Sequence, residues 1–303
     1  MKKSTLTNPI FDSILPDETT RIQLLRSTIE QFQLAGIRDP DRDAELLLCR
    51  ILNINHIKLY FDREKTVHRP EIRELNEIIR RRTQGEPLQY ILGETEFYGL
   101  PFKCDTRALI PRPETEILVD TALKFIEEND YSGVIDIGTG SGAIAVSIAV
   151  NTDCRITAAD KSESALKLAL NNARLNSVDS FIDFVQADIF APDFPDIAKK
   201  GYDMLVCNPP YVALDEIDSL DDEIKNYEPW EALTDYNDGL NFYRRLKEII
   251  PEIVKIDGIV IVELAENRAA QAKSILSPIL RDVKIIPDLA GKLRVLCGKR
   301  SSK

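Results

Sequence analysis

One short segment of the chain combines the residue types needed to hold a planar amino group. It is the run Asn208, Pro209, Pro210 and Tyr211, which follows an apolar stretch over 203–207. If that stretch is a strand of an open α/β sheet, the segment lies at its carboxyl end, where such sheets bind ligands. Two prolines stiffen the turn and remove two N–H donors. The Asn208 Oδ1 and the Pro209 carbonyl can then accept both hydrogens of an –NH₂ group, and Tyr211 offers a flat wall to a planar substrate. A proline-rich turn without chemistry is the plainer alternative.

A glycine-rich turn upstream has the composition of a cofactor loop. An apolar run over 133–137 leads into five small residues and then into the apolar stretch 143–150. The five are Gly138, Thr139, Gly140, Ser141 and Gly142. Glycines let the backbone turn sharply and let a ligand approach the main chain. The pattern predicts a site for a nucleoside-type cofactor. An ordinary strand–helix turn is the alternative, and a nicotinamide dinucleotide site also fits, because positions 138, 140 and 143 spell G-x-G-x-x-A.

Two aspartates follow the next expected strands. Asp160 ends the run 155–159 and lies 22 residues after Gly138. An acid at this position can accept hydrogen bonds from the two ribose hydroxyls of an adenosine moiety. A helix-start aspartate is its plainer interpretation. Asp188 follows the third strand and is a candidate for the adenine side, although a polar strand-end residue explains it equally well.

The elements that must position these residues alternate between strand and helix from about residue 108. Strands are expected at 133–137, 155–159, 182–186, 203–207, 258–263, 282–287 and 293–298. Helices are expected at 114–128, 142–150, 162–175, 239–254 and 266–278. This alternation predicts a doubly wound, mostly parallel sheet. The last two strands form a hairpin and make one strand antiparallel.

The first quarter of the chain has a different pattern. Apolar residues recur at helical spacing over 17–84, which predicts a small helical domain. The stretches 88–98 and 100–104 look strand-like, and Gly99 and Pro101 interrupt them. We expect a β-hairpin there. Three parts are therefore predicted: a helical domain over 1–85, a hairpin linker over 86–107 and an α/β domain over 108–303.

Composition narrows the function classes. The 303 residues carry 39 basic and 50 acidic side chains, a formal net charge of −11, which disfavours indiscriminate binding to a phosphate backbone. Five scattered cysteines without a C-x-x-C pair, and only two histidines, argue against a disulfide scaffold and against structural zinc. No metal is expected. The N-terminal stretch 1–16 lacks an apolar signal region, and no window is apolar enough to span a membrane. A cytoplasmic protein is expected.

The order of the glycine loop, the strand-two acid and Asn-Pro-Pro-Tyr resembles class I S-adenosylmethionine-dependent amino-methyltransferases. Adenine-N6 DNA methyltransferases and glutamine-N5 protein methyltransferases share this motif. Further segments resemble the HemK/PrmC family of glutamine-N5 methyltransferases, namely 81–93, 96–102, 109–116, Tyr227-Glu-Pro, Asp238-Gly-Leu, Glu263 and Gly291-Lys-Leu-Arg294. The resemblance implies a class I methyltransferase fold, Rossmann-like, with a seven-stranded sheet. It implies S-adenosyl-L-methionine as cofactor and S-adenosyl-L-homocysteine as product.

The resemblance also implies the substrate. Family members methylate the glutamine of the Gly-Gly-Gln loop in class I peptide chain release factors, which supports translation termination. Asn208, Pro209, Pro210 and Tyr211 would then hold and activate the glutamine, while Asn208 also borders the cofactor. The helical domain would recognise the protein partner, with a mere stability cap as its alternative. No nucleic acid or membrane partner is expected.

This chain departs from the family at three places. The Gly-Gly pair usual before Asp-Gly-Leu is absent from 233–238, Arg268 replaces a common glutamine, and Ile189 stands where some members have an adenine-stacking aromatic, with Phe190 next.

Some residues and the function keep alternative interpretations. The segment 110–116 suits a helix start as well as a cleft wall. Tyr227 and Trp230 are expected in the core, and a position facing the substrate is the alternative. The main alternative function is an adenine-N6 nucleic-acid methyltransferase; a cofactor-binding scaffold and a nicotinamide oxidoreductase are weaker alternatives.

Overall fold

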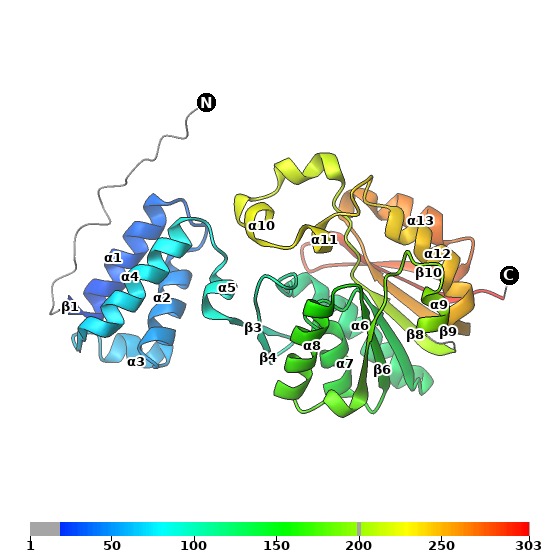
Figure 1. The fold of residues 1–303 in the computed structure, drawn as a ribbon, viewed down its shortest axis with the longest axis horizontal. Coiled ribbons are helices and arrows are strands. Elements are labelled where there is room, and N and C mark those ends of the chain that lie inside the picture. Colours follow the sequence, from blue (N-terminus) through cyan, green and yellow to red (C-terminus); the bar gives the residue numbers. More distant parts are fainter. Residues whose placement is uncertain (1–18, 199–200, 303) are drawn as a thin grey trace. The chain divides into compact units, whose positions relative to one another are not determined.

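The computed structural model describes residues 19–198 and 201–302. The chain divides into two compact units, one ending at Leu92 and the other beginning at Gly93 (Figure 1). In the described residues, no helix has both the length and the apolar character that crossing a lipid bilayer requires. The N-terminal stretch 1–16, for which no signal peptide is expected, lies outside the described residues.

The first unit is helical, with one very short strand pair. Its elements are β1 Thr19–Thr20, α1 Arg21–Leu34, α2 Pro40–Ile51, α3 His56–Phe61, β2 Thr66–Val67, α4 Arg69–Thr83 and α5 Leu88–Leu92. The Thr20 side chain and Gln23 form a capping box at the start of α1. Leucine, isoleucine and phenylalanine side chains from α1, α2 and α4 make its core. Buried Asp43 and Arg82 link α2 to α4 through a 2.8 Å ion pair.

One sequence prediction is wrong here, because residues 88–92 form the helix α5 and not a strand. Leu88, Ile91 and Leu92 recur at spacings of three and four, and all three pack onto the core of the helical unit. A short apolar run is compatible with either structure, and tertiary packing decided this one. The hairpin itself is confined to β3 Glu94–Phe97 and β4 Leu100–Lys103.

The second unit is a doubly wound α/β fold (Figure 1). Its strands are β5 Gly133–Ile137, β6 Arg155–Asp160, β7 Ile182–Gln186, β8 Tyr202–Cys207, β9 Val254–Glu263, β10 Leu280–Pro287 and β11 Leu293–Arg300. The order across the sheet is β10-β11-β9-β8-β5-β6-β7. β11 is antiparallel to both of its neighbours, while the other pairs are parallel. The predicted seven-stranded sheet with one antiparallel strand is confirmed.

Helices cover both faces of this sheet. They are α6 Glu116–Asn129, α7 Ala143–Asn151, α8 Glu163–Leu175, α9 Phe194–Ile197, α10 Asp222–Tyr227, α11 Trp230–Leu233, α12 Asn241–Ile253 and α13 Ala269–Leu276. Short 3₁₀ turns are η2 Pro113–Thr115, η3 Asp179–Phe181, η4 Leu214–Ser219 and η5 Glu266–Arg268. α6, α7 and α8 pack with the hairpin on one face, and α9, α12 and α13 pack on the other.

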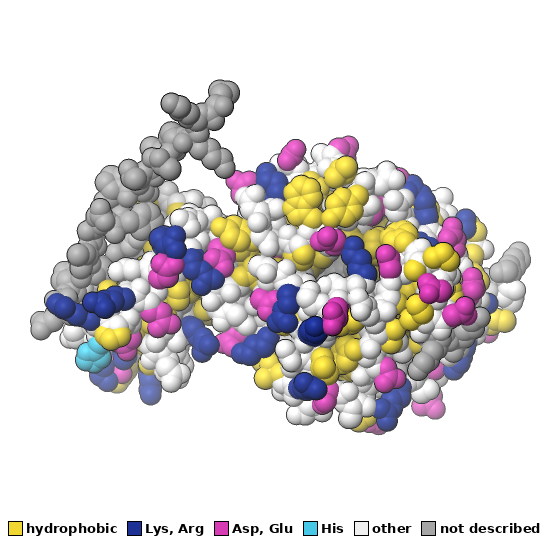
Figure 2. All heavy atoms as spheres, in the orientation of Figure 1, with side chains coloured by type: hydrophobic (Ala, Val, Ile, Leu, Met, Phe, Trp, Pro, Cys, Tyr) yellow, Lys and Arg dark blue, Asp and Glu magenta, His cyan; other side chains and the backbone are white. Residues whose placement is uncertain are grey.

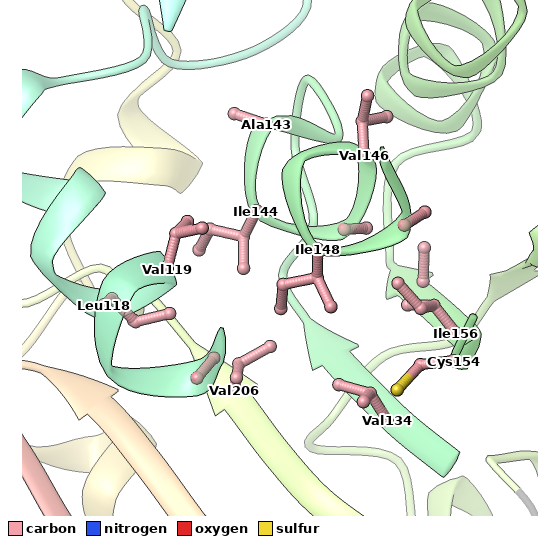
Figure 3. Packing of buried hydrophobic residues seen from close by; sticks show 14 of the residues in the cluster. Leu118, Val119, Val134, Ala143, Ile144, Val146, Ile148, Cys154, Ile156 and Val206 are labelled. Atoms are coloured by element: carbon pink, nitrogen blue, oxygen red, sulfur yellow. The ribbon is translucent and has the colours of Figure 1, made fainter. Parts of the chain in front are cut away.

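The alternation of side chains along each strand divides the core in two. Val134 and Val206 point toward the α6–α8 layer, where Val119, Ile144 and Ile148 converge on them (Figure 3). Their strand neighbours point into the other layer, as period-two geometry requires. Helix α7 is apolar nearly all round and is almost wholly buried, which anchors the turn that precedes it.

Candidate active site

The strand register brings four residues to one level at the carboxyl edge of the sheet. Ile137 pairs with Ala159 on β6 and with Cys207 on β8, and Cys207 pairs with Val262 on β9. The residues that follow these four are Gly138, Asp160, Asn208 and Glu263. β5 and β8 flank the point where the strand order reverses, which is where open α/β sheets bind ligands. Residues far apart in the sequence therefore meet at this point.

The glycine loop is held tightly between β5 and α7. The Gly138 N–H donates to the Ala159 carbonyl on β6 at 2.8 Å, and the Gly142 N–H donates to the Thr139 carbonyl at 2.8 Å. Gly142 has a φ of +82°, and a Cβ at this position would lie 3.0 Å from the Ala169 Cβ on α8. Only glycine combines this backbone conformation with so close an approach of the helix.

Two buried polar residues that the sequence analysis did not identify fix this loop. Asn172 on α8 donates to the Ser141 carbonyl at 2.9 Å, and it bonds both backbone groups of Lys103 on β4. Asp136 within β5 accepts a 2.7 Å hydrogen bond from the Thr139 hydroxyl. Burial raises the pKa of Asp136 to about 7. An acid inside an apolar strand was the available signal for Asp136, whereas nothing local distinguishes Asn172.

Asp160 ends β6 and lines the same cavity as the glycine loop. Its Oδ2 accepts from the Gly140 N–H at 2.9 Å, and its Oδ1 accepts from the Ser162 N–H at 2.9 Å. Burial raises the pKa of this carboxyl. Each oxygen keeps a further acceptor position, so Asp160 can support the loop and still accept from a ligand.

The loop after β7 supplies the next part of the wall. Asp188 is exposed and Ile189 is buried, and both line the cavity together with Phe190. Phe190 packs edge-to-face on Phe242 of α12 with ring centroids 5.0 Å apart. An aromatic surface is therefore present one residue after Ile189, the position at which some family members carry an adenine-stacking aromatic.

Only part of the Asn-Pro-Pro-Tyr segment lines the cavity. Asn208 and Pro210 line the cavity, whereas Pro209 and Tyr211 are not among the lining residues. The Asn208 Nδ2 donates to the Thr115 hydroxyl at 3.2 Å. The Tyr211 hydroxyl donates to Glu263 Oε1 at 3.2 Å instead of standing free.

Thr115 and Glu263 support this segment through hydrogen bonds. The Thr115 hydroxyl donates to Glu263 Oε2 at 2.7 Å. Glu263 is 2% exposed, and burial raises its pKa to about 7 against the opposing effect of its hydroxyl partners and of Arg294. The resemblance had singled out Glu263 only as a match, and these contacts are visible only in the folded chain.

The segment 106–115 forms the opposite wall of the cavity. Arg112 and Thr115 line the cavity, so this segment serves both as a wall and as the start of α6. Glu228 is buried, and it accepts from the Arg112 guanidinium and from the Ile110 N–H. This carboxylate thereby fastens the region between β8 and α12 onto the wall.

The region between β8 and α12 closes back on the strand end. Gly239 has a φ of +76°, and a Cβ there would lie 2.3 Å from the Tyr211 carbonyl oxygen. Arg268 donates to the Asp238 carbonyl at 2.8 Å and pairs with Glu216, so the arginine that departs from the family pattern holds this region in place. The expectation of a core position for Trp230 is wrong: it is 41% exposed, and its indole N–H donates to the Lys225 carbonyl.

Together these walls enclose one cavity of about 1090 Å³ within the second unit. The glycine loop, Asp160 and the loop after β7 make one part, while Asn208, Pro210 and the 106–115 wall make the other. The two groups of residues singled out for a nucleoside-type ligand and for an amino group therefore line the same space. Pro229, Glu231 and Tyr236 from the region after β8 also line it.

Comparison with known families agrees with this arrangement. Residues 23–93 match the PrmC N-terminal domain, and residues 114–223 match the methyltransferase small domain. Among solved structures, the catalytic domain of hMettl16, determined in complex with the MAT2A 3′UTR hairpin 6, has a TM-score of 0.52 at 16% identity. That match covers 79% of this chain and 85% of the other, and it supports the methyltransferase fold.

Curated relatives match over most of their length. The release factor glutamine methyltransferase of Fusobacterium nucleatum is 34% identical over all of this chain and 86% of its own. The enzyme of Chlorobaculum tepidum is 36% identical, and the match covers 88% of this chain and 92% of the relative. The enzyme of Bacillus subtilis is 35% identical, and the match covers 84% of this chain and 90% of the relative. The present chain belongs to the release factor glutamine methyltransferase family.

Proposed function

We propose that this protein transfers a methyl group from S-adenosyl-L-methionine to the side-chain amide nitrogen (N5) of the glutamine in the Gly-Gly-Gln loop of class I peptide chain release factors. One observation carries the proposal: Asn208 shares a single cavity with the glycine loop and Asp160. Names of relatives at 34–36% identity support the choice of a release factor as substrate.

The first part of the cavity fits the cofactor. Asp160 has acceptor positions left for ribose hydroxyls, and the glycine loop leaves room for close approach to the main chain. Asp188, Ile189 and Phe190 would border the adenine. When bound, S-adenosylmethionine supplies a methyl group made electrophilic by a positively charged sulfur.

The second part fits the acceptor amide. An amide nitrogen is a poor nucleophile, because its lone pair is delocalised into the carbonyl. Asn208 Oδ1 and the Pro209 carbonyl would each accept a hydrogen bond from one N–H group of the glutamine amide. These two bonds would orient the amide nitrogen toward the methyl group and increase its electron density. Pro210 keeps this turn rigid. Fixing the reacting groups in a near-attack geometry can lower the barrier by roughly 7–11 kcal/mol at best. The departing proton becomes strongly acidic once the nitrogen is alkylated, so a dedicated base is not required.

The helical unit, expected over 1–85 and extended by α5 to Leu92, would recognise the release factor, while the unit over 93–303, which begins with the β3–β4 hairpin, would carry the methyl transfer. A folded protein substrate needs more surface than a cofactor cavity offers, since a stable protein–protein contact buries about 1,600 Å². A role confined to stability is the competing explanation for this domain.

An adenine-N6 nucleic-acid methyltransferase is the second candidate, because it would use the same amino-group acceptors on a flipped base. An enzyme that binds nucleic acid favours a basic surface, because its substrate carries negatively charged phosphates. The second unit, residues 93–303, carries 24 basic and 36 acidic side chains. On the face drawn in Figure 2, side chains of both signs are interspersed. This charge distribution favours a protein substrate.

A methylation assay separates the two candidates. Purified release factor, release factor with its Gly-Gly-Gln glutamine replaced by alanine, and an adenine-containing oligonucleotide are each incubated with enzyme and S-adenosylmethionine, and products are mapped by mass spectrometry. We expect methyl only on the glutamine of the intact factor. Asn208→Ala should abolish turnover while largely retaining cofactor affinity, because its amide acts mainly toward the transition state. Methyl on the oligonucleotide, or on the alanine variant of the factor, would overturn the proposed substrate.

A further inference from the structure

We infer that Glu263 and Thr115 are positioning residues that determine which end of the Asn208 side-chain amide faces the acceptor. This inference rests on the proposed function, and it goes beyond that function by naming what orients the acceptor group. The contacts join three elements: η2 carries Thr115, β8 ends before Asn208 and β9 ends in Glu263.

The direction of the hydrogen bonds follows from the number of protons available. A threonine hydroxyl has one proton, and Thr115 donates it to Glu263 Oε2 at 2.7 Å. Toward Asn208 the same hydroxyl can only accept. The only donor on the Asn208 side chain is its Nδ2, which lies 3.2 Å from the Thr115 oxygen. The Asn208 Oδ1 is thereby left as the end available to an –NH₂ group.

Without the carboxylate, this direction is lost. The Thr115 proton would be free to point at Asn208, and a flipped amide would then be equally well bonded. A flipped amide presents its own –NH₂ to the acceptor –NH₂, so that two donors face each other. Glu263 therefore selects the productive orientation through Thr115.

Glu263 acts without contacting the acceptor itself. It is not among the cavity-lining residues, and both of its oxygens already accept from hydroxyls, Thr115 on one and Tyr211 on the other. The second bond steadies the far end of the Asn-Pro-Pro-Tyr segment. Tyr243 also donates to the Glu263 backbone carbonyl at 2.7 Å, which fixes the end of β9.

The surroundings of Glu263 point to a role other than stability. The charged and titratable groups around it are Arg294 of β11, Glu114 of η2, Cys207 of β8, Tyr211 and Tyr243. Desolvation dominates there and raises the pKa of Glu263 to about 7. Among the described residues, no cation lies within ion-pair distance of Glu263. A buried carboxylate without such a partner is costly to the fold, so its presence fits a positioning task.

The test compares side chains that differ by a single hydroxyl. Thr115→Val removes the proton donor at nearly constant shape, whereas Thr115→Ser keeps it. Thr121→Val is the matched control, because Thr121 lies on α6 and, among the residues that the structure describes, its hydroxyl bonds only the Ile117 carbonyl of the same helix. Glu263→Gln is the second variant, because a glutamine amide can donate to the Thr115 oxygen as well as accept from it, so Thr115 is no longer compelled to donate there. Circular dichroism and calorimetric titration first establish folding and cofactor affinity.

We expect Thr115→Val and Glu263→Gln to lower kcat at least tenfold, about 1.4 kcal/mol in barrier, with cofactor affinity nearly unchanged. Thr115→Ser should restore most of the rate, and Thr121→Val should match the parent protein. The Asn208 side-chain amide resonance, followed by NMR in the full chain, should move in Thr115→Val and Glu263→Gln but not in Thr121→Val.

The outcomes separate this inference from the proposed function. Each variant is assayed on whichever amino acceptor the parent enzyme methylates, so a different substrate overturns only the proposed function. Full turnover of Thr115→Val, or an unmoved Asn208 amide resonance in that variant, overturns the inference. The Asn208 amide resonance tests the inference even if the parent enzyme methylates none of the acceptors.

Discussion

At the residue scale, Asp160 combines two tasks. Its two oxygens accept from the Gly140 and Ser162 N–H groups, and the residue also lines the cavity proposed for the cofactor. A substitution therefore affects both the loop and the ligand, and the size of its effect depends on whether an oxygen acceptor remains.

Asp160→Ala is expected to weaken S-adenosylmethionine binding and leave the fold intact. Each lost hydrogen bond to a charged group is worth roughly 1.5–3 kcal/mol, which corresponds to at least a tenfold loss of affinity. Asp160→Asn keeps one oxygen and should fall between alanine and the parent protein. Calorimetric titration measures the affinities, with Asp183→Ala on the exposed side of β7 as the control. Equal affinities in all variants would refute the ribose assignment.

Glu263 and Asp136 lead to a prediction about stability and pH. Burial raises the folded-state pKa of each to about 7, above the ordinary values of 4.5 and 3.8. The folded chain therefore binds their protons more tightly than the unfolded chain does, so these groups lower the free energy of unfolding as pH rises from about 4 to 7. One pKa unit corresponds to about 1.4 kcal/mol.

Glu263→Gln removes one of these two contributions. The melting temperature of the variant, relative to the parent, should rise between about pH 5 and pH 8, because both proteins must ionise Asp136 in that range but only the parent must also ionise Glu263. Thermal unfolding at the two pH values measures the difference. A difference that is the same at both values would contradict the raised pKa.

At the element scale, the turn between α11 and α12 constrains the position of the Tyr211 backbone. Asp235 accepts from the Gly239 and Asn241 N–H groups, so the turn and the start of α12 are one hydrogen-bonded unit. Gly239 lies between this unit and the Tyr211 carbonyl. The geometry of the acceptor segment therefore depends on a residue 28 positions beyond it in the chain.

Gly239→Ala should impair both stability and turnover. The positive φ alone costs an alanine about 1–3 kcal/mol, and the 2.3 Å approach of its Cβ to the Tyr211 oxygen forces the strand-end loop to move. Gly99→Ala is the matched control, since Gly99 has a φ of +69° with no atom within 4 Å of the added Cβ. Thermal unfolding and kcat are measured for both. Similar losses in the two variants would show that backbone strain alone matters.

At the scale of the whole molecule, charge is unevenly divided between the two units. Residues 1–92 carry 15 basic and 14 acidic side chains, a net charge of +1, whereas residues 93–303 carry 24 basic and 36 acidic side chains, a net charge of −12. The helical unit has its own apolar core. This division fits a catalytic unit served by a separate recognition unit.

A truncated variant beginning at Gly93 tests the recognition role. It should keep S-adenosylmethionine binding, because every cavity-lining residue lies beyond that point. Its kcat/KM on intact release factor should fall, since the proposed protein contact is lost, and a short Gly-Gly-Gln peptide should be a poor substrate for both forms. Circular dichroism must first show that the variant folds. Equal kcat/KM values for the folded pair would leave the helical domain only a stabilising role.

Much of the fold could be predicted from the sequence because its signals are local. The apolar runs at 133–137 and 203–207 and the glycines at 138, 140 and 142 report their own conformation through spacing and backbone freedom. The parallel register then places Gly138, Asp160 and Asn208 at one edge of the sheet. The stretch 88–92 shows the limit of local signals, since contacts with the helical core made it a helix.

The support of the site was decided only in three dimensions. Thr115 lies 148 residues before Glu263 and 93 before Asn208, and no periodicity or motif signals a hydrogen bond across such distances. Asn172 likewise meets Ser141 only because α8 packs beside the glycine loop. Residue types and spacing determine which groups can accept an amino group or a ribose. The packing of η2, β8 and β9 decides which way those groups point, because a side-chain amide takes its direction from the partners that surround it.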